Sequence, residues 1–210
     1  KELTEQLLSD GGHYERSASY NAIIIEDILD IYNILKSYKK SSSRIENNIL
    51  KKISIILSSI KNHWPSIYKW YNSMIHLDGC YPSFNDGSQS AAAKVKNINN
   101  YAKSVGLNPI QQNNKKLSII YFNKTNFICA NTEKYKLIYN VGSPSPSYQP
   151  GHSHSESLSF EVSVPNQRII LNTGISTYEN SKERLMERSI KSHNCLSVNG
   201  QNCTETWGSF

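Results

Sequence analysis

The chain has 210 residues, with 23 Lys and Arg against 17 Asp and Glu, so its formal net charge is +6. No apolar run approaches the roughly 20 residues that a membrane-spanning helix needs, because Ile23–Ile25 is followed at once by Glu26 and Asp27. Aromatic residues make up 10% of the chain, which excludes wholesale disorder. We therefore expect a folded chain without a membrane span, with one sizeable core or two small ones.

The two ends of the sequence suggest a piece of a longer protein. The chain begins at Lys1 as though inside a helix, and it stops at Phe210 after a strand-like segment and a polar turn. A signal peptide would not be visible in such a piece.

The cysteines and the basic residues leave several interpretations open. The four cysteines form no CxxC pair, which disfavours a zinc ribbon, and the sequence does not choose between disulfides and free thiols. Basic doublets such as Lys39–Lys40 and Lys51–Lys52 are typical of solvated surface, although a positive field would also suit a polyanion. We expect no nucleic-acid partner, because no stripe of basic and aromatic residues is present.

Apolar residues at helical spacing predict that the first half of the chain is helical. A short helix is expected at 2–8, and an amphipathic helix from Ser19 to about Lys40. The expected buried face of the latter is Tyr20, Ile24, Ile28, Ile31 and Leu35.

Three more helices are predicted before residue 109. One runs over 44–64, a second begins at Pro65 and ends at Met74, and a third covers 91–105 with Gly106 as its stop. The expected inward residues of the first are Ile45, Ile49, Ile53, Ile56, Leu57 and Ile60. Turns are expected at 78–79 and 85–87.

After Pro109 the pattern changes to short β-rich segments. They are expected at 117–122, 126–130, 136–141, 158–164, 168–171 and 195–198. A polar linker is expected at 113–116, a proline-containing loop at 142–151, and a hairpin turn at Asn199-Gly200. Helices followed by antiparallel strands indicate two layers or domains, and we place the boundary between a helical unit, 1–112, and a strand-rich unit, 113–210.

Three groups of residues combine chemistry-bearing side chains. The first is Asp10–Ser17 with Tyr20, where polar groups surround a glycine turn that leads into a helix. A loop with a helix cap at Ser17 or Ser19 explains this group about as well. A tyrosine on an apolar helix face is by default a core residue.

The other two groups contain the histidines of the second half. His152 and His154 are two residues apart before a strand, so in an extended chain they face the same side and can share a metal or divide metal and substrate contacts. His193 can supply a third imidazole, and Arg188 can grip a carboxylate or sulfate. The simpler interpretation is exposed histidines in a Ser-rich loop and a charged surface loop.

Together these groups resemble the heparinase II/III-like polysaccharide lyases. The matching stretches are DGGHYERSASY, FNDGS, PGHSHSESLSFEVSV, ILNTGISTYE and ERLMERSIKSHNCLSVNGQNCTETWGSF, in the family's order from Ser9 to Phe210. The resemblance implies an α+β multidomain fold, in which an incomplete α/α toroid is followed by an antiparallel β-sandwich.

The resemblance also implies a reaction, the cleavage of a uronic-acid-containing acidic polysaccharide by β-elimination. Tyr20 and His152 fall at the family's catalytic tyrosine and histidine. A tyrosine with an ordinary pKa of about 10 is a poor base at neutral pH, so we expect Arg16, Arg188 or His152 to lower the pKa of Tyr20. The expected substrate-binding residues are His13, Glu15, Arg16 and Arg188. The family's Asn/His pair, which neutralises the carboxylate, would lie upstream of Lys1.

Some family members carry a structural zinc, and the positions carried over are His154, Asn172 and His193. Asn172 departs from the family's Asp, and an amide is a weaker ligand than a carboxylate. Glu156 is an alternative donor, although it is not at the family's ligand position. Without zinc, we expect His154 and His193 to hydrogen-bond within the sandwich and to orient the loop that carries His152.

A second hypothesis is a non-catalytic carbohydrate-binding or structural module that retains the fold. It is motivated by Asn172 and by the missing upstream half. By analogy with the family, we expect a periplasmic or secreted location.

Overall fold

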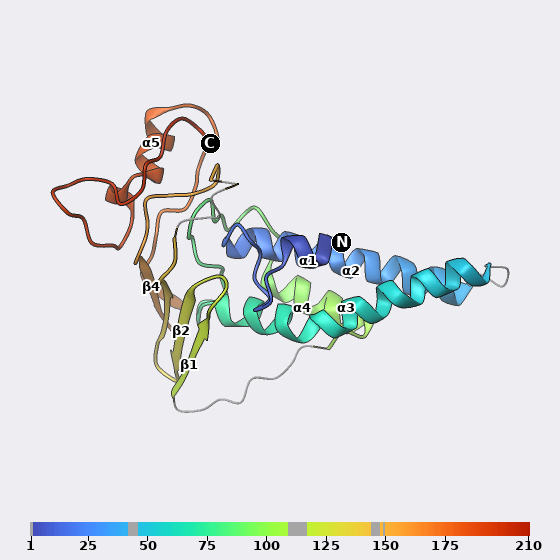
Figure 1. The fold of residues 1–210 in the computed structure, drawn as a ribbon. Coiled ribbons are helices and arrows are strands. Elements are labelled where there is room, and N and C mark those ends of the chain that lie inside the picture. Colours follow the sequence, from blue (N-terminus) through green and yellow to red (C-terminus); the bar gives the residue numbers. More distant parts are fainter. Residues whose placement is uncertain (1, 42–45, 109–116, 144–147, 149) are drawn as a thin grey trace.

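The computed structural model describes residues 2–41, 46–108, 117–143, 148 and 150–210, with four main helices before a five-stranded sheet (Figure 1). The predicted order, with helices before antiparallel strands, is confirmed, but one further helix that was not predicted follows the strands. The helices are α1 (Glu2–Gln6), α2 (Ala18–Ser41), α3 (Asn47–Met74), α4 (Val95–Val105) and α5 (Lys182–Arg188), with a 3-10 turn η1 (Ile190–Ser192). The strands are β1 (Leu117–Phe122), β2 (Phe127–Thr132), β3 (Lys136–Asn140), β4 (Phe160–Val164) and β5 (Gln167–Ile170).

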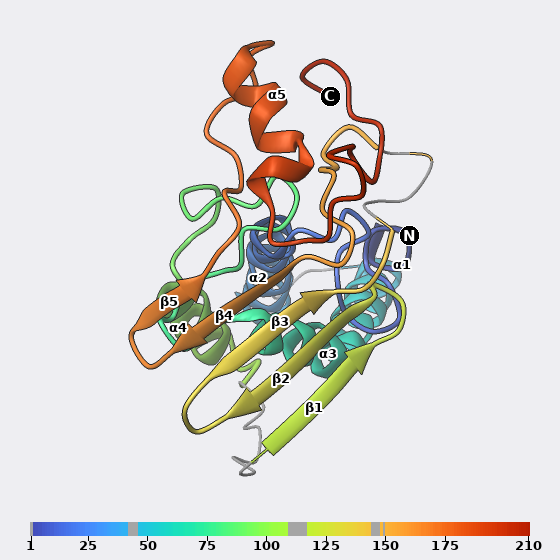
Figure 2. The same ribbon diagram turned by 90° about the vertical axis from the view of Figure 1, so that its left-hand side faces the viewer.

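The strands form one antiparallel sheet in the order β1-β2-β3-β4-β5, with helices α2 to α4 behind one of its faces (Figure 2). The inner face carries buried apolar residues that share a core with the helices. Trp70 of α3 contacts Phe122 and Phe127, and Met74 lies against Cys129, with 3.7 Å between the two sulfur atoms. Burial of these side chains stabilises the packing of the helices on the sheet.

The outer face of the sheet is also apolar. The register places Tyr121 opposite Ile128, Ile128 opposite Tyr139, and Tyr139 opposite Phe160. Ile119, in the neighbouring row, is 65% exposed. A large apolar surface is unusual on a sheet face that is exposed to solvent. It is consistent with a second sheet that covers this face. The β-sandwich and the incomplete α/α toroid both stay predictions.

Helix α2 confirms the predicted element but not its predicted face. Its buried apolar stripe is Ala18, Ala22, Ile25, Ile28, Leu29 and Tyr32. Only Ile28 of the predicted face belongs to it, and Ile31 is 48% exposed. The predicted helical period is confirmed. Which side of the helix is buried depends on the contacts of α2 with both α3 and α4, and local spacing does not encode those contacts.

Helix α3 is one helix where two were predicted, with Pro65 in its interior. Trp64 before Pro65 and Ile67 after it are both buried in the shared core. Packing on both sides thus outweighs the ~3 kcal/mol that an interior proline costs. Ile49 and Ile56, predicted to point inward, are exposed, whereas Ile53 and Ile60 are buried. Ile45 lies outside the described residues.

The predicted stop of α4 is confirmed, although this helix begins at Val95 rather than at residue 91. Gly106 has φ of +86°, a left-handed conformation, and its N–H caps carbonyls of the last turn. The predicted strand at 195–198 is wrong, because only an isolated bridge joins Val198 to Gln201. The predicted turn at Asn199-Gly200 is confirmed, because φ is positive at both residues.

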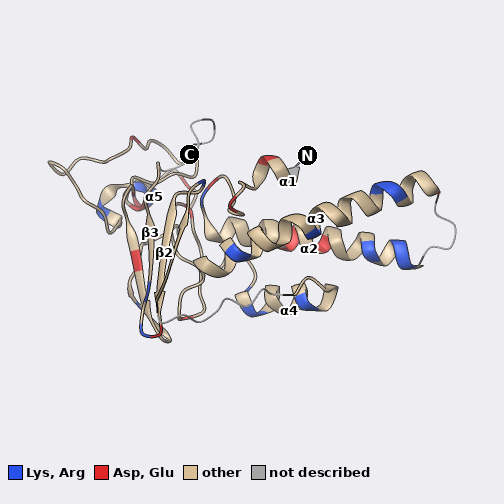
Figure 3. Ribbon diagram, turned by 60° about the horizontal axis from the view of Figure 1, so that its bottom comes forward, with Lys and Arg blue, Asp and Glu red and all other residues tan. Residues whose placement is uncertain are grey.

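Several other predictions fall partly or wholly on residues that the structure does not describe. The linker at 113–116 and the boundary at 112/113 lie outside the described residues, as does much of the 142–151 loop. Within the described part of the chain no helix has the length and apolarity to cross a membrane. The four cysteines are free thiols. The lysine doublets of α2 and α3 lie at the end of this helix pair that points away from the sheet (Figure 3).

Candidate active site

Tyr20 and His152 meet where the helical half joins the strand-rich half. Tyr20 projects from the first turns of α2, and His152 lies in the loop before β4. The phenol oxygen of Tyr20 lies 3.3 Å from Nδ1 of His152. The two rings pack edge to face with centroids 5.3 Å apart. The structure therefore brings together the two side chains that the resemblance singled out, from positions 132 residues apart.

A buried carboxylate, Asp86, connects the residues around this pair. Its Oδ2 lies 2.8 Å from His152 Nδ1, and its Oδ1 lies 2.7 Å from His154 Nε2. Arg184 of α5 holds both carboxylate oxygens, with Nη2 donating to Oδ2 at 2.9 Å. Four donors thus converge on one fully buried carboxylate. Such charge-assisted, bidentate contacts fix geometry as well as contributing energy.

The local sequence explains why Asp86 points inward. Asn85 adopts a left-handed φ of +52°, which Asn tolerates better than most residues. Its backbone N–H donates to Glu156 at 2.9 Å, and the N–H of Gly87 closes a turn on the Phe84 carbonyl. The predicted turn at 85–87 is therefore confirmed, and it presents the Asp86 carboxylate to the two histidines.

The charges of this group follow from its contacts. Burial alone would raise the pKa of Asp86, but hydrogen bonds from His152, His154 and Arg184 outweigh it and lower this pKa. The hydrogen bond to Asp86 raises the pKa of His152, so the imidazole favours its charged form. Burial lowers the pKa of His154, which favours a neutral ring.

The pKa of Tyr20 is raised, not lowered as expected from nearby positive charge. Burial is the largest cause, followed by the hydrogen bond with Tyr178 and by the charge of Asp86. The arginines proposed to lower this pKa are engaged elsewhere. Arg16 contacts Ser143, and Arg188 is tied to backbone carbonyls.

A second aromatic residue, Tyr178, borders the same site. Its hydroxyl is hydrogen-bonded to the hydroxyl of Tyr20. Its ring stacks on Phe210, with centroids 5.5 Å apart and an interplanar angle of 9°. The Arg184 guanidinium lies over the same ring, 5.3 Å from its centroid. Phe210 and Arg184 thus hold the Tyr178 ring beside the hydroxyl of Tyr20.

The expected substrate-binding residues are unevenly placed. His13 and Glu15 are largely buried, and burial lowers the pKa of His13 to about 4. Arg16 has a φ of +57° and donates to Ser143 Oγ at 2.9 Å. Arg188 is buried, and its guanidinium donates to the carbonyls of Ser153, Trp207 and Gly208. These guanidinium contacts are those of a residue that holds loops together.

Two of the expected zinc ligands, His154 and His193, lie close together. The rings of His154 and His193 are 5.3 Å apart, and His154 Nδ1 and both nitrogens of His193 are buried without a hydrogen bond of normal geometry to the described residues. Burial, followed by the charge of His154, lowers the pKa of His193 to about 3. Nδ1 of His193 also lies 3.5 Å from Oε2 of Glu156. Neutral imidazoles are suited to binding a metal.

Asn172, the third expected zinc ligand, fits a metal site less well than the two histidines. The Asn172 amide nitrogen donates to Ser159 Oγ at 2.9 Å, and its oxygen accepts from the backbone of Asn194 at 3.3 Å. Burial raises the pKa of Glu156 well above its ordinary value, which favours a neutral carboxyl. Among the described residues no group of three His, Cys, Asp or Glu side chains is placed to hold a metal ion. Zinc binding stays a prediction.

Three residues of the site were not singled out as site residues from the sequence: Asp86, Arg184 and Tyr178. Asp86 lies in FNDGS and Tyr178 in ILNTGISTYE, two of the stretches that carry the family resemblance. Arg184 lies in ERLMERSIKSHNCLSVNGQNCTETWGSF, another of these stretches. The matching stretches were therefore a signal for these positions, but the sequence around each residue does not indicate that the three side chains meet.

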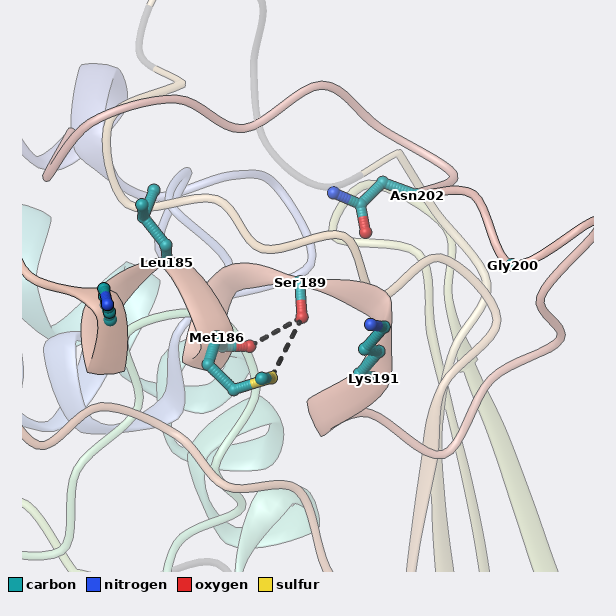
Figure 4. Close-up of a pocket in the computed structure, with 7 residues that line it drawn as sticks. Leu185, Met186, Ser189, Lys191, Gly200 and Asn202 are labelled. Carbon is teal, nitrogen blue, oxygen red and sulfur yellow. Dashed lines mark hydrogen bonds between the residues drawn. The ribbon is translucent and has the colours of Figure 1, made fainter.

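A separate open pocket of about 420 Å³ lies beside α5 (Figure 4). There Ser189 Oγ donates to the carbonyl of Met186 at 2.8 Å. Its lining residues are Lys182, Leu185, Met186, Ser189, Lys191, Gly200 and Asn202. None of the predicted site residues lines this pocket, so it is distinct from the Tyr20–His152 group.

Two protein families match the sequence of this chain. Residues 1–115 match the family described as heparinase II/III N-terminus, and residues 114–210 match heparinase II/III-like, C-terminal. No curated relative matched the sequence.

Solved structures show the same fold. Heparan sulfate lyase HepC from Pedobacter heparinus aligns with a TM-score of 0.65 and 17% identity, over 96% of this chain and 32% of that one. Heparinase III, the BT4657 gene product, aligns with a TM-score of 0.68 and 16% identity, over 96% and 32%. This chain therefore spans about a third of their length. The two family matches together cover the whole sequence, and the chain belongs to the heparinase II/III-like family.

Proposed function

We propose that the chain supplies the tyrosine–histidine part of a polysaccharide lyase active site, acting on a uronic-acid-containing acidic polysaccharide by β-elimination. The observation that carries the proposal is the 3.3 Å contact between the Tyr20 hydroxyl and His152. Family membership and the likeness to structures named heparan sulfate lyase and heparinase III support it.

The elimination needs a base for the proton beside the uronate carboxylate and an acid for the leaving glycosidic oxygen. With its raised pKa, Tyr20 is a hydroxyl at neutral pH, which suits the acid step. The base step needs the ionised phenol. A charged His152, favoured by Asp86, stabilises negative charge on the Tyr20 oxygen and on the substrate carboxylate.

Two further expectations accompany this proposal. A structural zinc held by His154, Asn172 and His193 would fix the loop that carries His152, and it would take no direct part in proton transfer. A periplasmic or secreted location follows from the likeness to the family, and fractionation of cells that express the full-length protein tests it.

The experiment uses the full-length protein with heparan sulfate, chondroitin sulfate, alginate and bacterial capsular polymers. The unsaturated product of β-elimination is followed by its ultraviolet absorbance. We expect Tyr20→Phe to abolish the signal while circular dichroism stays unchanged. Tyr135→Phe, at an exposed tyrosine in the β2–β3 turn, is the matched control and should retain activity.

Absence of product with every polymer would contradict the proposal. If an oligosaccharide binds without turnover, the alternative of a non-catalytic carbohydrate-binding module is favoured. If Tyr20→Phe retains full activity, the lyase proposal survives but Tyr20 is not its acid or base.

A further inference from the structure

Two of the four free cysteines contact one residue of the histidine loop, the loop that carries His152 and His154. Cys203 Sγ lies 3.2 Å from Oγ of Ser155, and Cys195 Sγ lies 3.9 Å from the carbonyl oxygen of Ser155. Ser155 is fully buried and directly follows His154 in the sequence. The two thiols therefore reach one buried residue from two points of the C-terminal segment.

A tight turn between the two cysteines reverses the chain. The backbone φ is positive at both Asn199 and Gly200, as in the type I′ turns that join antiparallel strands. An antiparallel bridge between Val198 and Gln201 flanks this turn. Counted outward from the bridge, the position across from the first cysteine is the one that follows the second. The turn thus brings the two ends of the 195–203 segment close together.

The backbone around the two cysteines lets both thiols face the same way. In a regular pair of strands, neighbouring residues point to opposite sides, which would keep the two thiols apart. The chain is not regular here, because it bends at both cysteines. Both sulfur atoms are directed to Ser155, whose Oγ also accepts a hydrogen bond from the backbone N–H of Thr204 at 3.2 Å. Burial, followed by the charge of Cys203, raises the pKa of Cys195 to about 11, so the two thiols are also within electrostatic reach of each other.

The other two cysteines lie in different surroundings. Cys129 is buried in the core, where an oxidant in solution does not reach it. Cys80 is exposed, and its sulfur contacts a backbone carbonyl of its own turn. In the pair at the histidine loop, Cys203 is exposed and Cys195 is partly buried. An oxidant therefore meets Cys203 first, with a second thiol close behind it.

We propose that Cys195 and Cys203 are a redox modification site, whose disulfide fastens the C-terminal segment to the histidine loop at Ser155. The oxidant is a low-molecular-weight disulfide such as oxidised glutathione. An oxidising compartment, such as the expected periplasmic or secreted location, would favour the disulfide. The inference does not depend on the proposed lyase function.

The exchange takes two balanced steps. The Cys203 thiol loses its proton to water, and its thiolate attacks one sulfur of oxidised glutathione, which forms a mixed disulfide and expels one glutathione thiolate. Cys195 then loses its proton, and its thiolate attacks the Cys203 sulfur, which forms the bond between the two cysteines and expels the second glutathione thiolate. The cysteine pair is oxidised by two electrons, and oxidised glutathione is reduced to two thiols, which take up the two protons.

The test uses the full-length protein in buffers of oxidised and reduced glutathione, followed by denaturation, alkylation and trypsin. No Lys or Arg lies between Lys191 and Phe210, so one tryptic peptide that begins at Ser192 contains both cysteines. In the oxidised protein this peptide should take up no alkyl label and be two hydrogens lighter than its reduced form. Hydroxylamine cleaves the Asn199-Gly200 bond between the cysteines, and the two halves should stay joined until they are reduced.

Two variants test the order of the steps. In Cys195→Ser, the exposed Cys203 should accumulate as a mixed disulfide with glutathione, because the second thiol is missing. In Cys203→Ser, the partly buried Cys195 should gain much less glutathione. Cys80→Ser, at the other exposed cysteine, is the matched control and should leave the disulfide unchanged.

A second measurement tests whether the disulfide fastens the segment to the histidine loop. The backbone N–H of Thr204 bonds Ser155 Oγ, so its hydrogen exchange should be slower in the oxidised protein than in the reduced protein. Equal exchange in the two forms would overturn the fastening role. Cys195→Ser should show no difference in Thr204 exchange between the two buffers.

The alkylation experiment has clear contrary outcomes. If both cysteines are labelled at every glutathione ratio, or if the two halves separate after hydroxylamine without reduction, the inference is overturned. A disulfide between Cys203 and Cys80 in place of Cys195 also overturns it. None of these readouts measures turnover, so they stand or fall separately from the lyase proposal.

Discussion

Asp86 and Arg184 form a bidentate ion pair in which both side chains are fully buried. The pair joins the 83–87 turn to α5 across 98 residues of sequence. Because Asp86 also bonds His152 and His154, the position of the two imidazoles depends on an arginine outside the loop that carries both histidines. The candidate active site is therefore organised around a carboxylate.

Arg184→Met should strongly destabilise the protein, because it leaves the Asp86 carboxylate buried without its bidentate partner. The expected loss is ~3–5 kcal/mol in the free energy of unfolding, measured by denaturant titration. Arg184→Lys keeps the charge but not the two parallel hydrogen bonds, so its loss should be smaller. Lys182→Gln, at an exposed position of the same helix, is the control and should leave stability unchanged. A Lys variant that is as stable as the unsubstituted protein would show that the bidentate geometry contributes little.

Because His13 is buried, the stability of the protein should depend on pH. Burial, followed by the charge of His152, lowers its pKa to about 4 in the folded chain, whereas an unfolded histidine has a pKa of about 6.5. Between these values only the unfolded state binds the proton. Stability should therefore fall as the pH decreases from about 6.5 to about 4, by at most ~1.4 kcal/mol per pH unit for this residue.

His13→Gln should make the stability of the protein less sensitive to pH in this window. The measurement is urea unfolding at a series of pH values for both proteins. The matched control is His63→Gln, at a partly buried histidine on α3 that bonds the Ser59 carbonyl, and it should retain the original slope. An unaltered slope in His13→Gln would mean that His13 is accessible to protons in the folded state.

The apolar outer face of the sheet predicts a covering layer in the full-length protein. Ile119 on β1 is 65% exposed in the described chain. If a second sheet covers it, Ile119→Ser creates a polar cavity, and the free energy of unfolding of the full-length protein should fall by about 2–4 kcal/mol. Lys134→Ser, in the β2–β3 turn, is the control. A change within about 0.5 kcal/mol for Ile119→Ser would be typical of an exposed position and would count against the sandwich.

Asn172→Asp tests the expected zinc site directly. A carboxylate is a better zinc ligand than an amide, so the substitution should strengthen zinc binding in equilibrium dialysis of the full-length protein. Without metal, Asn172→Asp should destabilise the protein. In the unsubstituted chain the Asn172 amide nitrogen donates hydrogen bonds to Ser159 and Glu156, and a carboxylate cannot donate them. His193→Gln should weaken binding in both backgrounds. Destabilisation of Asn172→Asp that zinc does not relieve would argue against a metal at this place.

Much of the fold could be predicted because its signals are local. Gly106 ends α4 since glycine adopts a left-handed φ at low cost, and Asn199-Gly200 forms its turn for the same reason. Alternating apolar residues placed the five strands to within a few residues. The family resemblance, carried by short motifs, correctly identified the family and paired Tyr20 with His152.

Other features depend on contacts between residues that are far apart in the chain. The phase of α2 is set by neighbours on two sides, and the continuity of α3 through Pro65 is set by a core that packs both halves of the helix. Neither can be deduced from a window of sequence, because each results from a balance between local propensity and burial.

By itself the sequence determined the helical segments before residue 109, the five strands and the motifs that they carry, because those properties depend on neighbouring residues. It did not indicate α5. Only the tertiary structure decided that Asp86 holds Arg184 and both histidines, and that Tyr178 reaches the hydroxyl of Tyr20. Those contacts join positions separated by 66 to 158 residues. A hydrogen bond needs its partners within about 3 Å, and folding of the whole chain is what brings them to that distance.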